Sequence, residues 1–566
     1  MARKSMWDSR GYLIMNNLEE NTHDILDEIP SDSESVDDIF SDSEELESGA
    51  SVTEPVAVIE ETGIEGCGVE TSVDVDDSED DNPLSVRLSD MDGIWEKKRR
   101  SFDTGVFVKD HGPNVPETLE SPSDTFLYLL TEDMLEHLLY HTNLYATQLG
   151  KQFEPATLNE IKVFLAINIL MGVVRRPSYR DYWSSNPQLR DSFIASLMPV
   201  NRFGWFLTNL HLNNNVLQPK SGEPNYDKLY KLRPLLETLS RTYREYYNPG
   251  QYQSVDESMI KFKGRSSIKQ YMPQKPIKRG YKVWVRADET GFVCQFQIYT
   301  GKIENTRELN LGKRVVEDLT KELVGGNHKV FFDNFFTSVD LMIALKQKNI
   351  YGCGTVRRGR VGLPKEEKAD SKMKRGEFES RTSYAGVSWL KWKDRKCIQF
   401  LSNFHDPSVV STVSRKEKTG TVCEITCPQL VKDYNKHMGY VDKADMLKSL
   451  YEIDRKCRKW WHRIFWHFCD VTVTNAYILY SIRSEGAKLS LKNFRLAVVD
   501  GLVGATLPSP RGRKTLPKPV SYFKPSVPYE KRFDKVAHMP VRGSSRRCAQ
   551  CSTKAQPHRS KWACST

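Results

Sequence analysis

The sequence predicts an α+β protein of several domains, and three changes of pattern carry that prediction. Apolar residues recur at helical spacing between residues 118 and 250. From residue 252 the period shortens to two, as is typical of strands, and from residue 311 expected helices alternate with expected strands. A chain of 566 residues is long enough for two to four compact units.

The N-terminal part, residues 1–117, has the composition of a disordered acidic tail. Residues 17–93 contain 26 Asp or Glu residues and a single basic residue, Arg87, which gives this stretch a charge of −25. A segment with so much charge and few large apolar side chains cannot bury enough surface to fold. We expect a solubilising tail; an internal competitor for the partner of the basic body is the alternative.

The rest of the chain is strongly basic. Since the whole chain carries +8, the residues outside 17–93 carry +33. Such a charge favours a polyanionic partner, most simply nucleic acid, because the release of counterions drives association.

The longest apolar stretch, residues 163–174, is too short to cross a bilayer, so we expect no membrane partner. Eleven cysteines without a dense framework indicate a reducing compartment.

Residues 118–250 are expected to form a helical region. Apolar periodicity predicts helices over residues 131–150, 158–174 and 225–247. The last of these carries many Lys and Arg residues, which fit contact with phosphate, although a solvated helix face has the same composition.

Residues 251–357 predict a sheet with helical crossovers. Three strands are expected first, followed by helix, strand, helix and strand, at residues 252–262, 280–288, 291–301, 311–324, 328–335, 338–349 and 351–357. Three antiparallel strands followed by crossover-linked parallel strands is the order of an RNase H-like mixed sheet. A generic α/β domain is the alternative.

The remainder of the chain interrupts this core and then returns to helices. Residues 358–430 are basic at first and then predict short strands, which indicates a β-rich insertion. Helices are expected again between residues 431 and 506. Residues 507–547 have the composition of a basic, Pro-rich linker, and a cysteine-containing segment, 548–566, follows.

Four acidic residues have positions that suit a metal site. Asp333 follows an apolar run near the end of an expected central strand, and Asp256 has a similar place in the first strand. Asp442 and Asp445 are three residues apart, which puts them on one face of an expected helix. Carboxylates that converge need a cation, and two Mg²⁺ or Mn²⁺ ions can activate water in phosphodiester cleavage. Without convergence, they are unrelated caps and turn residues.

Four sequence blocks carry a resemblance. They are SVDESMIKFKG, VFFDNFFTS, YNKHMGYVDKADM and RKWWHRIFWHFCDVTVTNAYILY. In this order they resemble the characteristic blocks of piggyBac transposases and of the domesticated proteins derived from them, and the resemblance covers residues 118–566. It implies that Asp256, Asp333 and Asp442 match the three metal-binding catalytic aspartates of a DDD site. Asp445 matches a fourth essential acid.

The resemblance also implies an architecture. Residues 251–357 and 431–455 would be the two parts of an RNase H-like core. Residues 358–430 match the insertion domain of the family. Residues 118–250 resemble its dimerisation and DNA-binding helices, and residues 456–506 resemble a further helical DNA-binding part.

The implied activity is cut-and-paste transposition. It comprises metal-assisted hydrolysis at transposon ends, hairpin formation on the excised ends, and joining into TTAA targets, with Mg²⁺ or Mn²⁺ as cofactor. The implied partners are double-stranded DNA, as transposon ends and as target, and a second copy in a homodimer. DNA as the substrate implies a nuclear location. Two alternatives remain: a domesticated DNA-binding protein without transposition, and a nuclease that cuts without choosing its ends.

Basic residues around the acids are candidate DNA contacts, because cations beside aromatic rings suit phosphate contact and base stacking. Trp460 matches a family tryptophan near the cleavage point, whereas we expect Trp461 to anchor the core and His437 to be structural. The other candidates lie in a basic hairpin, residues 262–282, and after the helical acids: Lys261, Lys263, Arg265, Lys269, Lys278, Arg279, Lys282, Arg455, Lys456, Arg458 and Lys459.

The C-terminal cysteines are candidate zinc ligands. Cys548 and Cys551 have the spacing of a zinc site, and Cys564 follows after 12 intervening residues. The family ends in a cross-braced pair of zinc sites that reads transposon-end DNA. This sequence stops at Thr566, so three thiolates, with His558, are left for one Zn²⁺. A site that binds no zinc, with loss of end-specific recognition, is the alternative.

Overall fold

The computed structural model divides into two compact units, Met1–Leu507 and Pro508–Thr566, and each is described by itself. The expected acidic stretch, residues 17–93, and most of the expected linker lie outside the described residues. Those are residues 95–97, 102, 104–273, 275–301, 308, 310–417, 420–455, 457, 459–484, 489–504, 540–547 and 559–564.

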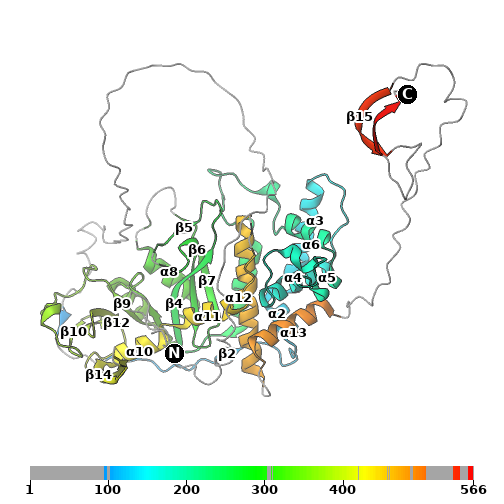
Figure 1. The fold of residues 1–566 in the computed structure, drawn as a ribbon. Coiled ribbons are helices and arrows are strands. Elements are labelled where there is room, and N and C mark those ends of the chain that lie inside the picture. The colour runs from blue at the N-terminus through cyan, green and yellow to red at the C-terminus, as the bar shows by residue number, and fades with distance from the viewer. Residues whose placement is uncertain are drawn as a thin grey trace, which may run out of the picture. The chain divides into compact units, whose positions relative to one another are not determined.

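A mixed sheet of ten strands forms the centre of the first unit (Figure 1). Its path runs β1-β10-β11-β12-β9-β8-β4-β6-β5, and β7 pairs with β6 beside this path. The strands are β1 (Trp95–Glu96), β4 (Tyr252–Lys261), β5 (Gln270–Tyr271), β6 (Arg279–Asp288), β7 (Val293–Ile298), β8 (Lys329–Phe332), β9 (Tyr351–Val356), β10 (Phe378–Ser383), β11 (Ser388–Lys393) and β12 (Cys397–Ser402).

The order of elements expected for residues 251–357 is confirmed. β4, β6 and β7 pair antiparallel, and β4, β8 and β9 pair parallel. The helices α8 (Leu311–Leu319) and α9 (Val339–Gln347) connect the parallel strands. β8 is buried on both faces, because Val330 and Phe332 belong to one hydrophobic cluster and Phe331 to another. A strand with two covered faces needs an apolar sequence, as β8 has.

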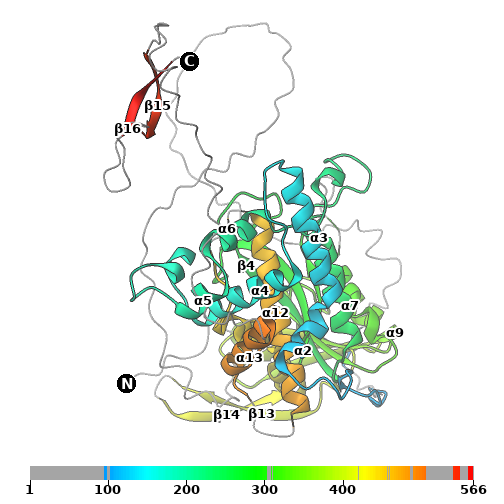
Figure 2. The same cartoon turned by 90° about the vertical axis from the view of Figure 1, so that its right-hand side faces the viewer.

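The strands expected within residues 358–430 divide between two sheets. β10, β11 and β12 extend the central sheet, since β12 pairs antiparallel with β9. β13 (Val410–Lys416) and β14 (Val422–Pro428) form a separate two-stranded ribbon (Figure 2). The insertion is therefore β-rich in the described residues, but three of its five strands belong to the core sheet. Its standing as a separate domain remains a prediction.

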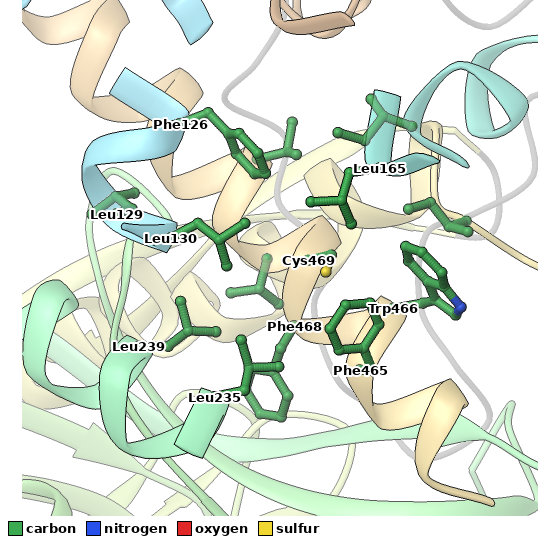
Figure 3. Close-up of a cluster of buried hydrophobic side chains, with 14 of the residues drawn as sticks. Phe126, Leu129, Leu130, Leu165, Leu235, Leu239, Phe465, Trp466, Phe468 and Cys469 are labelled. Atoms are coloured by element: carbon green, nitrogen blue, oxygen red, sulfur yellow. The ribbon is translucent and has the colours of Figure 1, made fainter. Parts of the chain in front are cut away.

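Helices from both ends of the first unit pack around α12 (Trp460–Arg483). Phe465, Trp466 and Phe468 of α12 lie among apolar side chains of α2, α4 and α7 (Figure 3). The other helices are α2 (Pro122–Leu130), α3 (Glu132–Gln148), α4 (Leu158–Val173), α5 (Ser192–Leu197), α6 (Val200–Asn209), α7 (Arg233–Glu245), α10 (Gln429–His437), α11 (Tyr440–Leu450), α13 (Leu491–Val503) and the 3₁₀ turns η1 (Tyr179–Trp183), η2 (Asn215–Leu217), η3 (Lys321–Leu323) and η4 (Asp370–Lys372).

The expectation of one helix over residues 225–247 is wrong at its start. The helix α7 begins at Arg233, and Pro234 lies in its first turn. A proline ring lacks the N–H and clashes with the preceding turn, so it is tolerated at a helix start and not inside a helix. The core role expected for Trp461 is confirmed, since this side chain is buried.

The remaining strands are short or belong to the second unit. β2 (Gly112–Pro113) pairs with β3 (Tyr247–Asn248), and β15 (Pro540–Arg547) pairs with β16 (Arg559–Cys564). Within the described residues, no helix combines the length and the apolar character that crossing a bilayer requires.

Candidate active site

The strand register brings two of the expected acids together. β4 and β8 are parallel neighbours, and Val255 lies opposite Phe332. The next residues along the two strands are Asp256 and Asp333, and both are half-buried. Their carboxylates therefore lie on neighbouring strands at the point where β8 ends.

The helix α11 covers the same face of β4 that carries Asp256. The backbone N–H of Val441 donates to Ser254 Oγ at 3.2 Å, and Ser258 Oγ donates to Asp445 Oδ1 at 2.8 Å. Residues two apart on a strand share a face, so Asp256 lies between these two contacts and faces α11. This packing brings the third expected acid, Asp442 on α11, close enough for its charge to act on Asp256.

The electrostatic state of the two strand acids is unfavourable. Burial raises the pKa of Asp256 well above its usual value, the charges of Asp333, Glu257 and Asp442 raise it further, and the charge of Lys275 opposes them. Burial also raises the pKa of Asp333, with a contribution from Glu257 and opposition from nearby ammonium groups. The fold thus keeps two carboxylates where neither is readily ionised, which indicates a place for a cation.

A tight turn fixes the orientation of Asp333. The backbone N–H of Phe335 donates to Asp333 Oδ1 at 2.9 Å, and Thr337 Oγ1 donates to the Asp333 carbonyl at 2.7 Å. Ser338 then caps α9 by accepting from the backbone N–H of Leu341 at 3.2 Å. One carboxylate oxygen of Asp333 is therefore held by its own turn.

Asp445 is tied to the interior of the fold. Besides the bond from Ser258, its Oδ1 lies 3.2 Å from Lys448 Nζ. The same ammonium donates to His467 Nδ1 of α12 at 3.3 Å. Burial, together with the charge of Lys448, lowers the pKa of His467 well below its usual value, so this ring stays a neutral acceptor. Asp445 thus links α11 to β4 and α12.

The structure adds three residues that the sequence did not single out as a group. Glu257, next to Asp256 on β4, pairs with Lys275 at 2.8 Å and with Lys282 at 3.0 Å. Burial opposes the ionisation of Glu257, but Lys282 and Lys275 lower its pKa below the usual value. The available sequence signal was the adjacency of Glu257 to Asp256, and the charge of Glu257 acts on both Asp256 and Asp333.

The donor set at the strand ends fits a divalent cation by its chemistry. Asp256 and Asp333 offer hard carboxylate oxygens, and their mutual repulsion is relieved by a positive ion. Within the described part of the chain, no three His, Cys, Asp or Glu side chains are close enough together to hold one ion. Asp256 and Asp333 would therefore hold the ion first, and Asp442 would have to approach to complete the set.

The expected DNA contacts in the basic hairpin fall into two groups. Lys282 is only 8% exposed and pairs with Glu257, so its placement does not support the expected contact with phosphate. Lys269 is half-buried and donates to the Gly264 carbonyl at 2.6 Å. The remaining hairpin candidates are exposed: Lys261, Lys263, Arg265, Lys278 and Arg279.

The candidates after α11 are mostly engaged within the fold. Arg455 donates to Asn168 Oδ1 at 2.6 Å and lies over the ring of Trp466 at 5.4 Å, which is a structural arrangement. Lys459 donates to the Thr208 carbonyl. Trp460 is half-buried and packs against the main hydrophobic cluster. Lys456 and Arg458 lie outside the described residues.

The expected zinc ligands are only partly described. Cys564 is the last residue of β16 and lies opposite Pro540. Cys548, Cys551 and His558 lie outside the described residues, so the zinc site remains a prediction. His437 is buried and stacks on Tyr252 with ring centroids 4.0 Å apart, which agrees with the structural role expected for it.

Comparisons with known proteins identify relatives of this chain. A family model described as Transposase IS4 matches residues 121–477. The human PiggyBac transposable element-derived protein 3 is 31% identical over 446 residues, which cover 76% of this chain and 72% of that protein. The human PiggyBac transposable element-derived protein 2 is 27% identical over 478 residues, covering 81% and 78%.

A solved structure shares the fold. The cryo-EM structure of a piggyBac transposase synaptic complex with hairpin DNA superposes with a TM-score of 0.62 at 22% identity, over 70% of this chain and 84% of that one. The α+β fold with its large mixed sheet is thus the fold of that protein. From the family match, the relatives and this fold, the chain belongs to the piggyBac transposase family.

Proposed function

We propose that this chain is a metal-dependent DNA transposase of the cut-and-paste type, built on an RNase H-like arrangement of its core. The observation that carries the proposal is the register of β4 and β8, which puts Asp256 beside Asp333 under the acidic face of α11. Two neighbouring carboxylates repel each other and destabilise the fold, so their presence indicates a functional site that binds a ligand.

Each acid has its own part in the proposed reaction. Asp256 and Asp333 hold divalent cations, and Asp442, which is exposed on α11, completes the ligand set when DNA is bound. The ions, Mg²⁺ or Mn²⁺, would activate a water or a 3′-hydroxyl of the DNA and would stabilise the leaving oxygen. Asp445, held by Ser258 and Lys448, keeps α11 at the distance from β4 that this completion requires.

The substrate in this proposal is double-stranded DNA. The exposed cations of the hairpin next to Asp256, from Lys261 to Arg279, would hold its phosphates without reading bases. The solved relative contains hairpin DNA, which supports hairpin intermediates and DNA ends as substrates here. Joining into TTAA targets, a homodimer that holds two ends, and a nuclear location complete the proposal.

The test is DNA cleavage by the full chain with purified substitutions. We expect Mg²⁺-dependent or Mn²⁺-dependent nicking of duplex DNA, and a loss of at least a hundredfold on Asp333→Asn, because the carboxylate that holds the ion is removed. Asp340→Asn is the matched control, since Asp340 is exposed on α9 and should leave the rate within twofold.

A wild-type protein that binds duplex DNA and cleaves none with either metal would overturn the proposal. It would favour the alternative function, a domesticated DNA-binding protein without transposition. The name of the human relative, a transposable element-derived protein, makes this alternative the one to exclude first.

A further inference from the structure

Two lysines share one carboxylate beside the candidate metal site. Lys275 Nζ lies 2.8 Å from Glu257 Oε1, and Lys282 Nζ lies 3.0 Å from Glu257 Oε2. One carboxylate neutralises one ammonium, so one positive charge is left over. Asp256 and Asp333 supply the negative charge that this surplus faces, and the charges of both act on Lys275.

The two ammonium groups differ in their freedom to move. Lys282 belongs to β6, its side chain is 10% exposed, and its Nζ lies 4.4 Å from the ring centroid of Phe335. Lys275 belongs to the loop between β5 and β6, and its side chain is 28% exposed. Lys282 is therefore the fixed partner of Glu257, and Lys275 is the one that can leave.

The charges decide what happens when divalent ions enter. With Asp256, Asp333 and Glu257 all ionised, as metal binding requires, these acids and the two lysines, Lys275 and Lys282, sum to one negative charge. One divalent ion brings the sum to +1 and a second to +3, which opposes loading at close range. A DNA phosphate lowers this sum, and an ammonium that moves away from the carboxylates lowers the local repulsion.

We propose that Lys275 is the internal counter-ion of the metal-free site and that it transfers to a DNA phosphate when divalent ions bind. The proposal deepens the proposed function, since it rests on Asp256 and Asp333 as metal ligands. It makes metal and DNA binding mutually dependent: each removes the charge that opposes the other. A site that holds its own cation also reduces the repulsion between the two acids before DNA arrives.

The test is the affinity of the full chain for Mn²⁺ alone, measured from the free-ion electron paramagnetic resonance signal. We expect Lys275→Met to bind Mn²⁺ about tenfold more tightly than the wild type, because a competing charge is removed. Lys492→Met, at an exposed lysine of α13 with no part in the proposed site, should stay within twofold of the wild type. Lys275→Arg keeps the charge and should also match the wild type.

A second measurement addresses the transfer to DNA. Added duplex DNA should raise the Mn²⁺ affinity of the wild type severalfold and that of Lys275→Met much less. Unchanged or weaker Mn²⁺ binding by a folded Lys275→Met variant would overturn the counter-ion role, as would equal enhancement by DNA in both proteins. Wild-type Mn²⁺ binding that survives Asp256→Asn and Asp333→Asn would instead show that the proposed metal site is wrong.

Discussion

Buried acids occur in two regions of this protein and have opposite surroundings. In the helical region, Asp470 of α12 pairs with Arg495 of α13 and accepts the backbone N–H of Ile453 at 2.7 Å. In the middle of β4 and just after β8, Asp256 and Asp333 have each other as neighbours. The first acid has an arginine of its own, whereas the second pair is offset only in part, by lysines that also pair with Glu257. Acids that are only partly offset within a fold indicate a site for a ligand.

The largest expected effect is at the compensated acid. Asp470→Ala leaves the fully buried Arg495 without its partner and should lower the free energy of unfolding by about 3–5 kcal/mol. Urea denaturation followed by circular dichroism measures the loss. Asp500→Ala, at an exposed position of α13, is the control and should change it by less than about 0.5 kcal/mol. Equal stability of the two variants would mean that the pair of Asp470 and Arg495 does not stabilise the helical region, and the contrast with the acids of the candidate metal site would fail.

At the candidate metal site, a substitution is expected to raise the free energy of unfolding. Asp256→Asn removes the repulsion with Asp333 and should raise the free energy of unfolding in EDTA by about 1–2 kcal/mol while abolishing cleavage. Thermal melting in EDTA and again in Mn²⁺ measures it, because the ion should stabilise the wild type and not the variant. A variant that is less stable than the wild type in EDTA would mean that the repulsion between the two acids is already fully offset within the fold.

The smallest expected change in stability is at Glu160, a partly exposed acid that has partners within the fold and so extends the comparison to the surface. Glu160 accepts from Arg202 at 2.8 Å and from the backbone N–H of Thr157 at 3.0 Å, in the capping box of α4. Burial by itself raises the pKa of Glu160, but the contacts with Arg202 and Thr157 outweigh it and lower the pKa below its usual value. Glu160→Gln should cost about 1 kcal/mol at pH 7.

The pH dependence follows from the direction of that shift. An acid with a lowered pKa in the folded state stabilises the fold above its unfolded value, near 4.5, and loses the effect as pH falls through the folded pKa. The difference in melting temperature between the wild type and Glu160→Gln should therefore shrink between pH 5 and pH 3. A difference in melting temperature that does not change with pH would mean that the substitution acts through packing and not through the charge of Glu160.

Several elements could be predicted because their signals are local. The apolar run that precedes Asp333 required a strand with two covered faces, and β8 is that strand. The start of α7 was misplaced although Pro234 marks it, so a local signal was overlooked there. The paired acids on α11 were expected from their spacing of three residues.

Other features of the site depended on distant segments. Lys282 was expected to contact DNA because of its charge, yet it lies against Phe335 and Glu257. Arg455 was expected to do the same and instead bonds Asn168, 287 residues earlier in the chain. The sequence shows directly which residues are charged, whereas the exposure of each one depends on which elements pack over it.

By itself, the sequence determined the kinds of element, their order in the core, and the place of Asp333 at the end of β8, whereas Asp256, expected at a similar place, lies in the middle of β4. Only the tertiary structure decided that Asp256 meets Asp333, that Ser258 holds Asp445 across 187 residues, and that Glu257 binds two lysines. The physical reason is range. Period and turn chemistry act over a few neighbouring residues, while a register or a docked helix is set by the packing of the whole sheet.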